Sequence, residues 1–236
     1  MLAYAVYGLT GFGSTVIALP VLAQLLPLKF AVPLLMLLDV SAFALSGAHF
    51  RRRIEYREIR WLIPFMLAGM AVGLTLLIQV AEQKLLAALG AFLLLYAGYG
   101  LARRGTPLSL ARAWCAPIGL VGGALAALFG TGGVLFAIYN AGRIRDKEAL
   151  RATNAAMILI SSGVRVLLFA AAGLLAQDGL LAAALVLLPA VFGGVWLGNR
   201  LHAAVSAAAV VKAVYALLVI AGLLLLARSL TLLFAL

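Results

Sequence analysis

The sequence predicts an all-α integral membrane protein built from two inverted-topology repeats. Of its 236 residues, 66% are hydrophobic and 11% are charged. The apolar residues form runs of roughly 20 residues, the length that spans a bilayer as a helix, and the runs show no polar face. Two of these runs are interrupted by clustered glycines at corresponding places in the two halves of the chain. This pattern gives little support to a water-soluble fold.

Eight apolar segments can be marked, and they divide into two sets of four. They span residues 2–26, 30–48, 61–80, 85–101, 114–140, 152–173, 180–199 and 208–227. The N-terminus lacks the basic start and the small-residue cleavage site of a signal peptide. We therefore expect it to belong to the mature membrane domain.

The two sets align as an internal duplication. "LTGFGS" at residues 9–14 matches "LFGTGG" at residues 128–133. A proline followed by two glycines recurs with the same spacing in the third segment of each set, at Pro64, Gly69 and Gly73 and at Pro189, Gly194 and Gly198. The four-residue spacing of these glycines is typical of close helix packing. The alignment predicts a first repeat at 1–104 and a second at 112–236 within a single membrane domain.

The basic residues indicate how many segments cross the membrane, because lysine and arginine concentrate in cytoplasmic loops. If all eight segments cross, nine basic residues lie inside and eight outside, which leaves almost no preferred orientation. If segments 2–26 and 114–140 instead dip in and return, fourteen lie inside and three outside, with Arg165 left within a helix. The three outside are then Lys29, Lys84 and Arg228. The charge pattern therefore favours two broken hairpins.

Each repeat then contains one broken hairpin helix and three full transmembrane helices. Because the number of full crossings is odd, the second repeat is inverted relative to the first. The basic loops at 49–60, 102–113 and 141–151 would all face the cytoplasm. Backbone that leaves helical form at membrane depth is tolerated only beside protein or a water-filled cavity. We therefore expect something polar to bind at the glycine clusters.

The glycine clusters are suited to an anion. Glycine can adopt positive φ and lets a ligand approach the backbone, and the helix that follows presents free N–H groups and a positive dipole end. Two facing hairpin tips would form one site near the membrane midplane. Close helix packing through small residues is the alternative explanation. The predicted substrate-binding residues of the two tips are Gly11, Phe12, Gly13, Ser14, Gly130, Thr131, Gly132 and Gly133.

Asp39 and Arg165 lie deep in corresponding segments, where a charge is costly and is usually paired or functional. One interpretation is an ion pair at the repeat interface, which could be purely structural. In another, Arg165 faces the substrate and Asp39 carries a coupling proton. Asn140 and Asn154 flank the second hairpin, where they could line a polar path, cap a helix or bond to a neighbour. Asn154 and Arg165 complete the predicted substrate-binding set.

The sequence shows no set of residues for catalysis or metal binding. His49 and His202 stand at segment ends beside arginines, and no catalytic triad, paired catalytic carboxylates or nucleotide-binding loop appears. We therefore expect no enzyme activity, no metal and no cofactor. The single cysteine, Cys115, gives no disulfide framework. The net charge of +11 fits cytoplasmic loops that face anionic lipids better than it fits nucleic-acid binding.

At these residues the sequence resembles the sulfite exporter TauE/SafE family, also called the toluene sulfonate uptake permease family. The resemblance covers nearly the whole chain and rests on "GFGSTVIALP", "ALFGTGGVLFAIY", "RDKEALRATNAAM" and the paired proline–glycine pattern. It implies a multi-pass protein of the bacterial inner membrane that carries sulfur-containing anions such as sulfite, sulfoacetate or related organosulfonates.

We therefore expect a secondary transporter that moves small sulfur-containing anions by alternating access. An anion-selective channel built on the same two hairpins is the alternative. The sequence leaves open which sulfur anion is carried, the direction of transport, the oligomeric state and the coupling ion, for which protons are one candidate.

Overall fold

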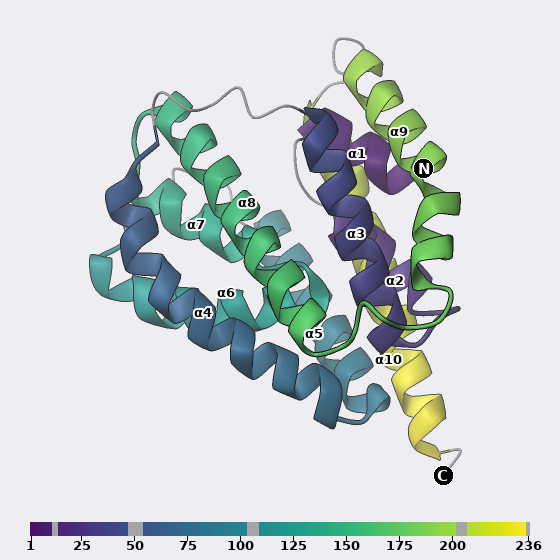
Figure 1. Ribbon diagram of the computed structural model, residues 1–236. Helices are drawn as coiled ribbons and strands as arrows, with labels where there is room; N and C mark the ends of the chain where they lie inside the picture. Colours follow the sequence, from purple (N-terminus) through teal and green to yellow (C-terminus); the bar gives the residue numbers. More distant parts are fainter. Residues whose placement is uncertain (11–13, 47–53, 103–108, 202–206, 235–236) are drawn as a thin grey trace. The chain divides into compact units, whose positions relative to one another are not determined.

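All secondary structure in the described part of the chain is helical. The computed structural model describes residues 1–10, 14–46, 54–102, 109–201 and 207–234. Its helices are α1 (Leu2–Thr10), α2 (Ser14–Leu22), α3 (Leu28–Ser46), α4 (Tyr56–Gln79), α5 (Glu82–Ala102), the 3-10 helix η1 (Arg112–Trp114), α6 (Cys115–Phe129), α7 (Gly133–Arg143), α8 (Lys147–Ala171), α9 (Leu180–Leu201) and α10 (Ala207–Phe234) (Figure 1). The predicted all-α class is confirmed for these residues.

Six helical stretches among the described residues are long and apolar enough to cross a membrane. They are Tyr56–Gln79, Glu82–Gly100, Arg112–Phe129, Lys147–Ala171, Leu180–Gly198 and Val214–Thr231. Five of them coincide with segments predicted to cross fully. The sixth, Arg112–Phe129, is the first part of a segment predicted to dip in and return, so its course through the membrane stays a prediction.

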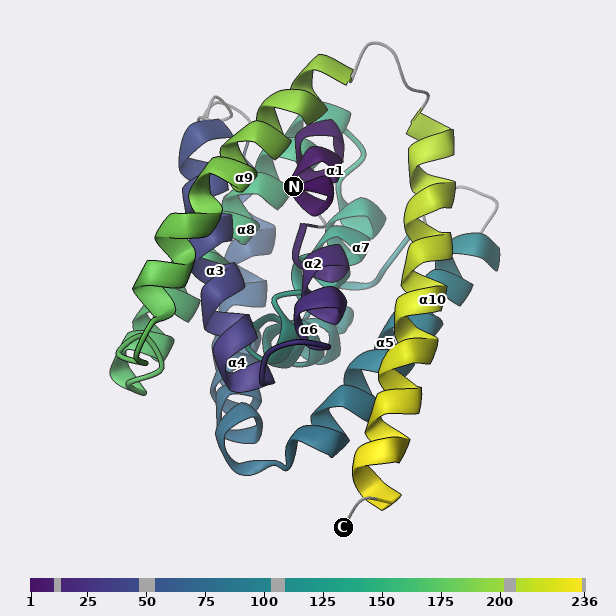
Figure 2. The same cartoon turned by 90° about the vertical axis from the view of Figure 1, so that its right-hand side faces the viewer.

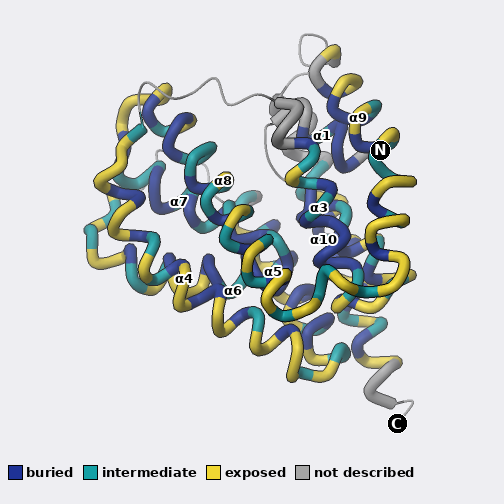
Figure 3. Tube along the Cα trace, viewed as in Figure 1, coloured by how far each residue is buried: buried dark blue, intermediate teal, exposed yellow. Residues whose placement is uncertain are grey.

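The membrane-length helices leave much apolar surface uncovered. At most 44% of any of the six stretches is buried. Exposed positions run along α4 and α9 (Figure 3), where large side chains such as Leu67, Val72, Leu185 and Val186 are exposed. A surface of this kind needs lipid around it, because a soluble protein rarely exposes so much contiguous apolar area.

Both glycine-interrupted segments contain two helices each, α1 and α2 in the first and α6 and α7 in the second. α6 ends where Gly130 has φ 70° and ψ 10°, the left-handed conformation that glycine adopts most easily. α7 then packs against α6, because a Cβ on Gly132 would meet the Gly122 carbonyl oxygen and the Ala126 side chain. The corresponding break between α1 and α2 lies outside the described residues.

The helices group into two compact units. Unit 1 contains Met1–Ala42, Gln79–Gly105 and Asp178–Leu236, and unit 2 contains Phe43–Ile78 and Thr106–Gln177. These units differ from the predicted halves, because α4 of the first half belongs to unit 2, whereas α9 and α10 of the second half belong to unit 1. The predicted repeats rest on sequence similarity, which this grouping does not test.

In unit 1, α5 and α10 lie side by side (Figure 2), and α1 packs against α9. Gly90 and Gly222 let the backbones of α5 and α10 approach, and the Ser229 hydroxyl donates to the Gln83 carbonyl at 2.8 Å. The contact between α9 and α1 is equally close. A Cβ on Gly194 of α9 would meet the backbone of Met1, which precedes α1, and the side chain of Tyr4 in α1.

In unit 2, α4 packs against α6. A Cβ on Gly69 would meet the Leu120 carbonyl, and one on Gly73 would meet the backbone of Ala124. The packing role predicted for these two glycines, and for Gly194 in unit 1, is confirmed. Each glycine-bearing helix therefore packs on the first helix of the interrupted segment of the other half of the chain. The same kind of packing therefore occurs in two pairs, α4 with α6 and α9 with α1, and the sequence pattern did not predict it.

Candidate functional site

The turn between α6 and α7 leads into the start of α7, where backbone N–H groups lack hydrogen-bond acceptors among the described residues. Before it, the Gly130 N–H donates to the Ala126 carbonyl at 3.0 Å and the Thr131 N–H donates to the Leu125 carbonyl at 3.3 Å. No acceptor for the N–H groups of Gly132 and Gly133 is present among the described residues. These two groups point along the start of α7, where the helix dipole is positive.

Thr131 supplies a side-chain donor at the same turn. The residue is 2% exposed, and its Oγ1 has no hydrogen-bond partner within the described ranges. A buried hydroxyl without a partner is uncommon, since burial removes its bonds to water. The turn therefore presents three donors from adjacent residues that the described protein does not use.

Gly133 has room for a side chain, unlike Gly132. A Cβ on Gly133 would meet only the Ile158 side chain, at an ordinary contact distance of 3.5 Å, and its φ is not positive. Neither packing nor backbone conformation therefore requires glycine there. Gly132 is different, because α6 fills the space beside it. The packing explanation thus accounts for Gly132 but not for Gly133.

Arg165 lies beside this turn. It projects from α8, is 4% exposed and donates from Nη1 to the Ala126 carbonyl at 3.0 Å. Ala126 is in the last turn of α6, where a positive charge complements the helix dipole. The guanidinium is therefore fixed one helical turn before Gly130.

Asn140 and Asn154 form a second polar contact between α7 and α8. The Asn140 Nδ2 donates to the Asn154 Oδ1 at 2.7 Å, and Asn140 is fully buried. The Asn140 Oδ1 has no partner within the part of the chain that is described. The two amides thus form a hydrogen bond with each other, which is one of the outcomes expected from the sequence. The Asn140 Oδ1 is left as an acceptor that the described residues do not use.

In unit 1, Asp39 accepts hydrogen bonds from three hydroxyl groups. The Tyr4 hydroxyl donates to Oδ1 at 3.0 Å, the Ser14 hydroxyl donates to Oδ1 at 2.9 Å, and the Thr15 hydroxyl donates to Oδ2. The carboxylate of α3 therefore joins α1 to the start of α2. The predicted site residues Gly11, Phe12 and Gly13 lie outside the described residues.

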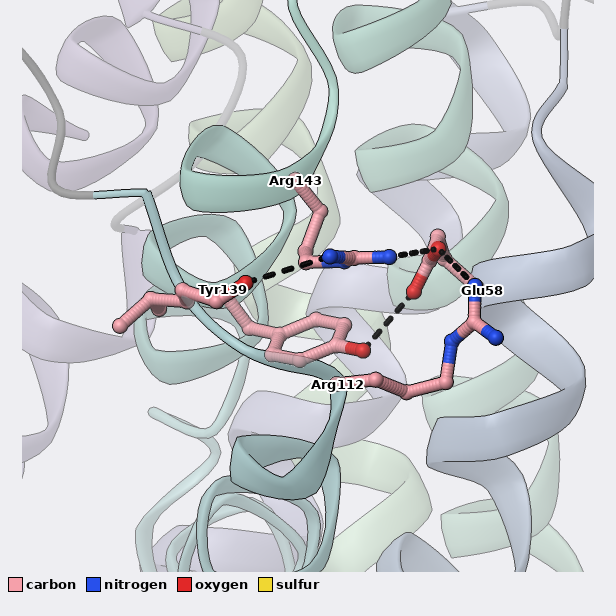
Figure 4. Close-up of polar contacts among 5 residues, drawn as sticks. Glu58, Arg112, Tyr139 and Arg143 are labelled. Carbon is pink, nitrogen blue, oxygen red and sulfur yellow. Dashed lines mark hydrogen bonds and ion pairs between the residues drawn. The ribbon is translucent and has the colours of Figure 1, made fainter.

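A cluster around Glu58 was missed by sequence reasoning (Figure 4). The Glu58 Oε1 accepts from Arg143 at 3.1 Å and from Arg112 at 3.5 Å, and Oε2 accepts from the Tyr139 hydroxyl at 2.8 Å. The Arg143 Nη1 also donates to the Leu110 carbonyl at 3.3 Å. The hydrogen bond to Glu58 raises the pKa of Arg143 above its ordinary value. The cluster ties the start of α4 to η1 and to the end of α7.

Comparison with known proteins agrees with the resemblance seen in the sequence. The family model described as Sulfite exporter TauE/SafE matches residues 1–225. The "Probable inner membrane transporter protein TsaS" of Comamonas testosteroni is 31% identical over 193 residues, which cover 80% of this chain and 80% of that protein. No solved structure matches. The chain therefore belongs to the sulfite exporter TauE/SafE family and is a membrane transporter.

Proposed function

We propose that the protein carries small sulfur-containing anions, such as sulfite, sulfoacetate or related organosulfonates, across the bacterial inner membrane by alternating access. The family description names sulfite export, and the relative TsaS is described as an inner membrane transporter. The observation that carries the proposal is the buried Thr131 hydroxyl, which lacks a partner among the described residues at the start of α7.

The anion binds at the α6–α7 turn. The Thr131 hydroxyl and the N–H groups of Gly132 and Gly133 donate to its oxygens, and the dipole of the 11-residue helix α7 favours its charge. A sulfite or sulfonate group has three oxygens that can accept these bonds. Gly133 lacks a side chain because a Cβ there would occupy the space of the ligand. The remaining predicted ligands, Gly11 to Ser14 and Asn154, stay proposals.

Arg165 adds the full positive charge that a desolvated anion needs. An anion that leaves water for a low-dielectric site loses its hydration energy, and backbone dipoles offset only part of that loss. The bond of Arg165 to the Ala126 carbonyl supports this role, because it fixes the guanidinium near the turn. The forked donors of arginine also match the oxygens of a sulfonyl group.

Asp39 carries the coupling proton in this scheme. Its carboxylate accepts three hydroxyl donors from α1 and α2, and protonation weakens such bonds because a carboxylic acid is a poorer acceptor. Proton uptake would therefore loosen the contact of α3 with the first interrupted segment. Asp39→Asn should preserve substrate binding and remove the response of uptake to a proton gradient. An unchanged response would exclude Asp39 as the coupling group.

We further propose that residues 114–140 enter and leave the membrane on the cytoplasmic side. Arg112 and Arg143 flank this segment, and both contact the same Glu58 carboxylate (Figure 4). The Leu110 N–H also donates to the Gly142 carbonyl at 3.1 Å. These contacts bring the two ends of the segment together, which supports a broken hairpin rather than a full crossing.

Cysteine labelling in intact cells tests this orientation. In a Cys115→Ser background, Arg145→Cys should be protected from a membrane-impermeant maleimide and Lys84→Cys should be labelled. A chain in which all eight segments cross would place both residues outside. Labelling of Arg145→Cys to the same extent as Lys84→Cys would therefore overturn the hairpin.

A glycine substitution with a matched control tests the anion site. Gly133→Ala should weaken binding of sulfite, sulfoacetate or thiosulfate in a ligand-induced thermal-shift screen while leaving the unliganded protein folded. Gly163→Ala on α8 is the control, because a Cβ there meets nothing within 4 Å. Equal ligand-induced shifts in both variants would remove the α6–α7 turn from the site. Flux that rises linearly with substrate concentration would instead favour the channel alternative.

A further inference from the structure

We propose that the start of α4 and η1 bind the phosphodiester headgroup of an anionic phospholipid in the cytoplasmic leaflet. The residues concerned form an arginine–tryptophan surface on unit 2, made of Arg57, Arg60, Trp61, Arg112 and Trp114. This surface is separate from the proposed anion site. It lies at the beginning of α6 and the turn lies at its end, and a 15-residue helix is about 22 Å long.

The side chains gather on one side of the α4 start. Arg57, Arg60 and Trp61 are exposed and follow a spacing of three and four residues, so they share one helix face. The Arg112 guanidinium lies 5.8 Å from the centroid of the Trp61 ring, which joins η1 to that face. The residues Trp61 and Trp114 are 49% and 51% exposed.

The Glu58 cluster leaves Arg112 with surplus positive charge. Glu58 has one negative charge, and Arg143 holds it at 3.1 Å while also donating to the Leu110 carbonyl. Arg112 is 3.5 Å from the same oxygen, and its side chain is 33% exposed. A guanidinium has five N–H donors, of which this contact uses one. Arg57 and Arg60 add two further charges nearby, against one exposed carboxylate in the described stretch 54–61, that of Glu55.

A lipid fits this surface better than a soluble phosphate does. Tryptophan concentrates at the level of the headgroups, where its ring is amphipathic and its N–H finds a partner. Below the arginines, α4 and α6 expose Leu67, Leu120 and Val121, which offer apolar contact to acyl chains. Arginine near an anionic membrane surface contributes about 1 kcal/mol per residue. The positive charge and the apolar area together therefore favour a molecule that has both an anionic headgroup and acyl chains.

Native mass spectrometry of the detergent-solubilised protein tests the proposal. Phosphatidylglycerol should remain bound in preference to phosphatidylethanolamine of the same chain length. Arg112→Gln should weaken its binding about fivefold, and Arg57→Gln combined with Arg60→Gln should weaken it further. The double variant guards against misfolding, because neither arginine makes a hydrogen bond or ion pair within the described residues. Arg151→Gln, an exposed arginine of α8 outside the surface, is the control.

Three results would overturn the proposal. The first is equal retention of the two lipids by the unaltered protein. The second is an equal loss in the Arg112→Gln and Arg151→Gln variants, which would indicate diffuse attraction rather than a site. The third is displacement of phosphatidylglycerol by an equal concentration of soluble glycerol phosphate, which would show that the acyl chains contribute nothing.

Discussion

Replacing Thr131 by valine separates stability from substrate binding, because the two should change in opposite directions. Valine keeps the branched shape of threonine and removes only the hydroxyl. That hydroxyl is buried and has no hydrogen-bond partner among the described residues, so the substitution removes no hydrogen bond from the unliganded protein. The anion, however, loses a donor at the start of α7.

The magnitudes follow from the burial of the group. A buried polar group without a partner costs about 1–3 kcal/mol, so Thr131→Val should raise the free energy of unfolding by up to that amount. A hydrogen bond to a charged acceptor contributes about 1.5–3 kcal/mol. Loss of that bond corresponds to anion binding that is about tenfold to about a hundredfold weaker.

The assay measures thermal unfolding and binding of sulfite or sulfoacetate on the same samples. Thr131→Ser is the matched control, because it keeps the hydroxyl and should bind within a few-fold of the unaltered protein. If Thr131→Val binds the anion as the unaltered protein does, the hydroxyl is not a ligand. Lower stability in Thr131→Val would show that the hydroxyl has a structural partner, and would also contradict the reasoning.

Three further predictions test separate parts of the account. Arg165→Ala should nearly abolish anion binding and Arg165→Lys should weaken it, because an ammonium lacks the forked donors of arginine; binding isotherms with unchanged affinity would exclude the arginine from the site. Glu58→Gln should lower the free energy of unfolding by about 1–3 kcal/mol, because two partly exposed arginines lose their shared carboxylate; denaturation of the purified protein measures this. Gly69→Ala should lower the melting temperature, because its Cβ meets the Leu120 carbonyl, whereas Gly98→Ala, in open space on α5, should not.

The break at Gly130 and the packing glycines could be predicted from sequence because both are local patterns. Clustered glycines end α6 at Gly130, and the four-residue spacing of Gly69 and Gly73 marks a helix surface that a neighbour can approach closely. The helix ends predicted from apolar runs are less accurate, because the first or last turn of a helix can be polar and then lies outside the apolar run. α8 begins at Lys147 rather than near residue 152, since the Asp146 carboxylate caps the helix by accepting from the N–H groups of Glu148 and Ala149.

The contacts between distant residues could not be predicted in this way. Glu58 and Arg143 are 85 positions apart, and nothing in either local sequence indicates the other. The hydrogen bond from the Ser14 hydroxyl to Asp39 in α3 was likewise not indicated by either local sequence. The grouping of α4 with unit 2, and of α9 and α10 with unit 1, likewise depends on tertiary packing. Hydropathy and spacing describe single helices and do not specify which helices meet.

Uptake of radiolabelled sulfite by proteoliposomes tests the central claim most directly. The account predicts uptake that saturates with sulfite concentration, responds to an imposed proton gradient, and falls strongly in the Thr131→Val and Gly133→Ala proteins but not in Gly163→Ala. Uptake no greater than in protein-free liposomes, for sulfite and for the organosulfonates alike, would contradict the claim that this protein transports sulfur-containing anions.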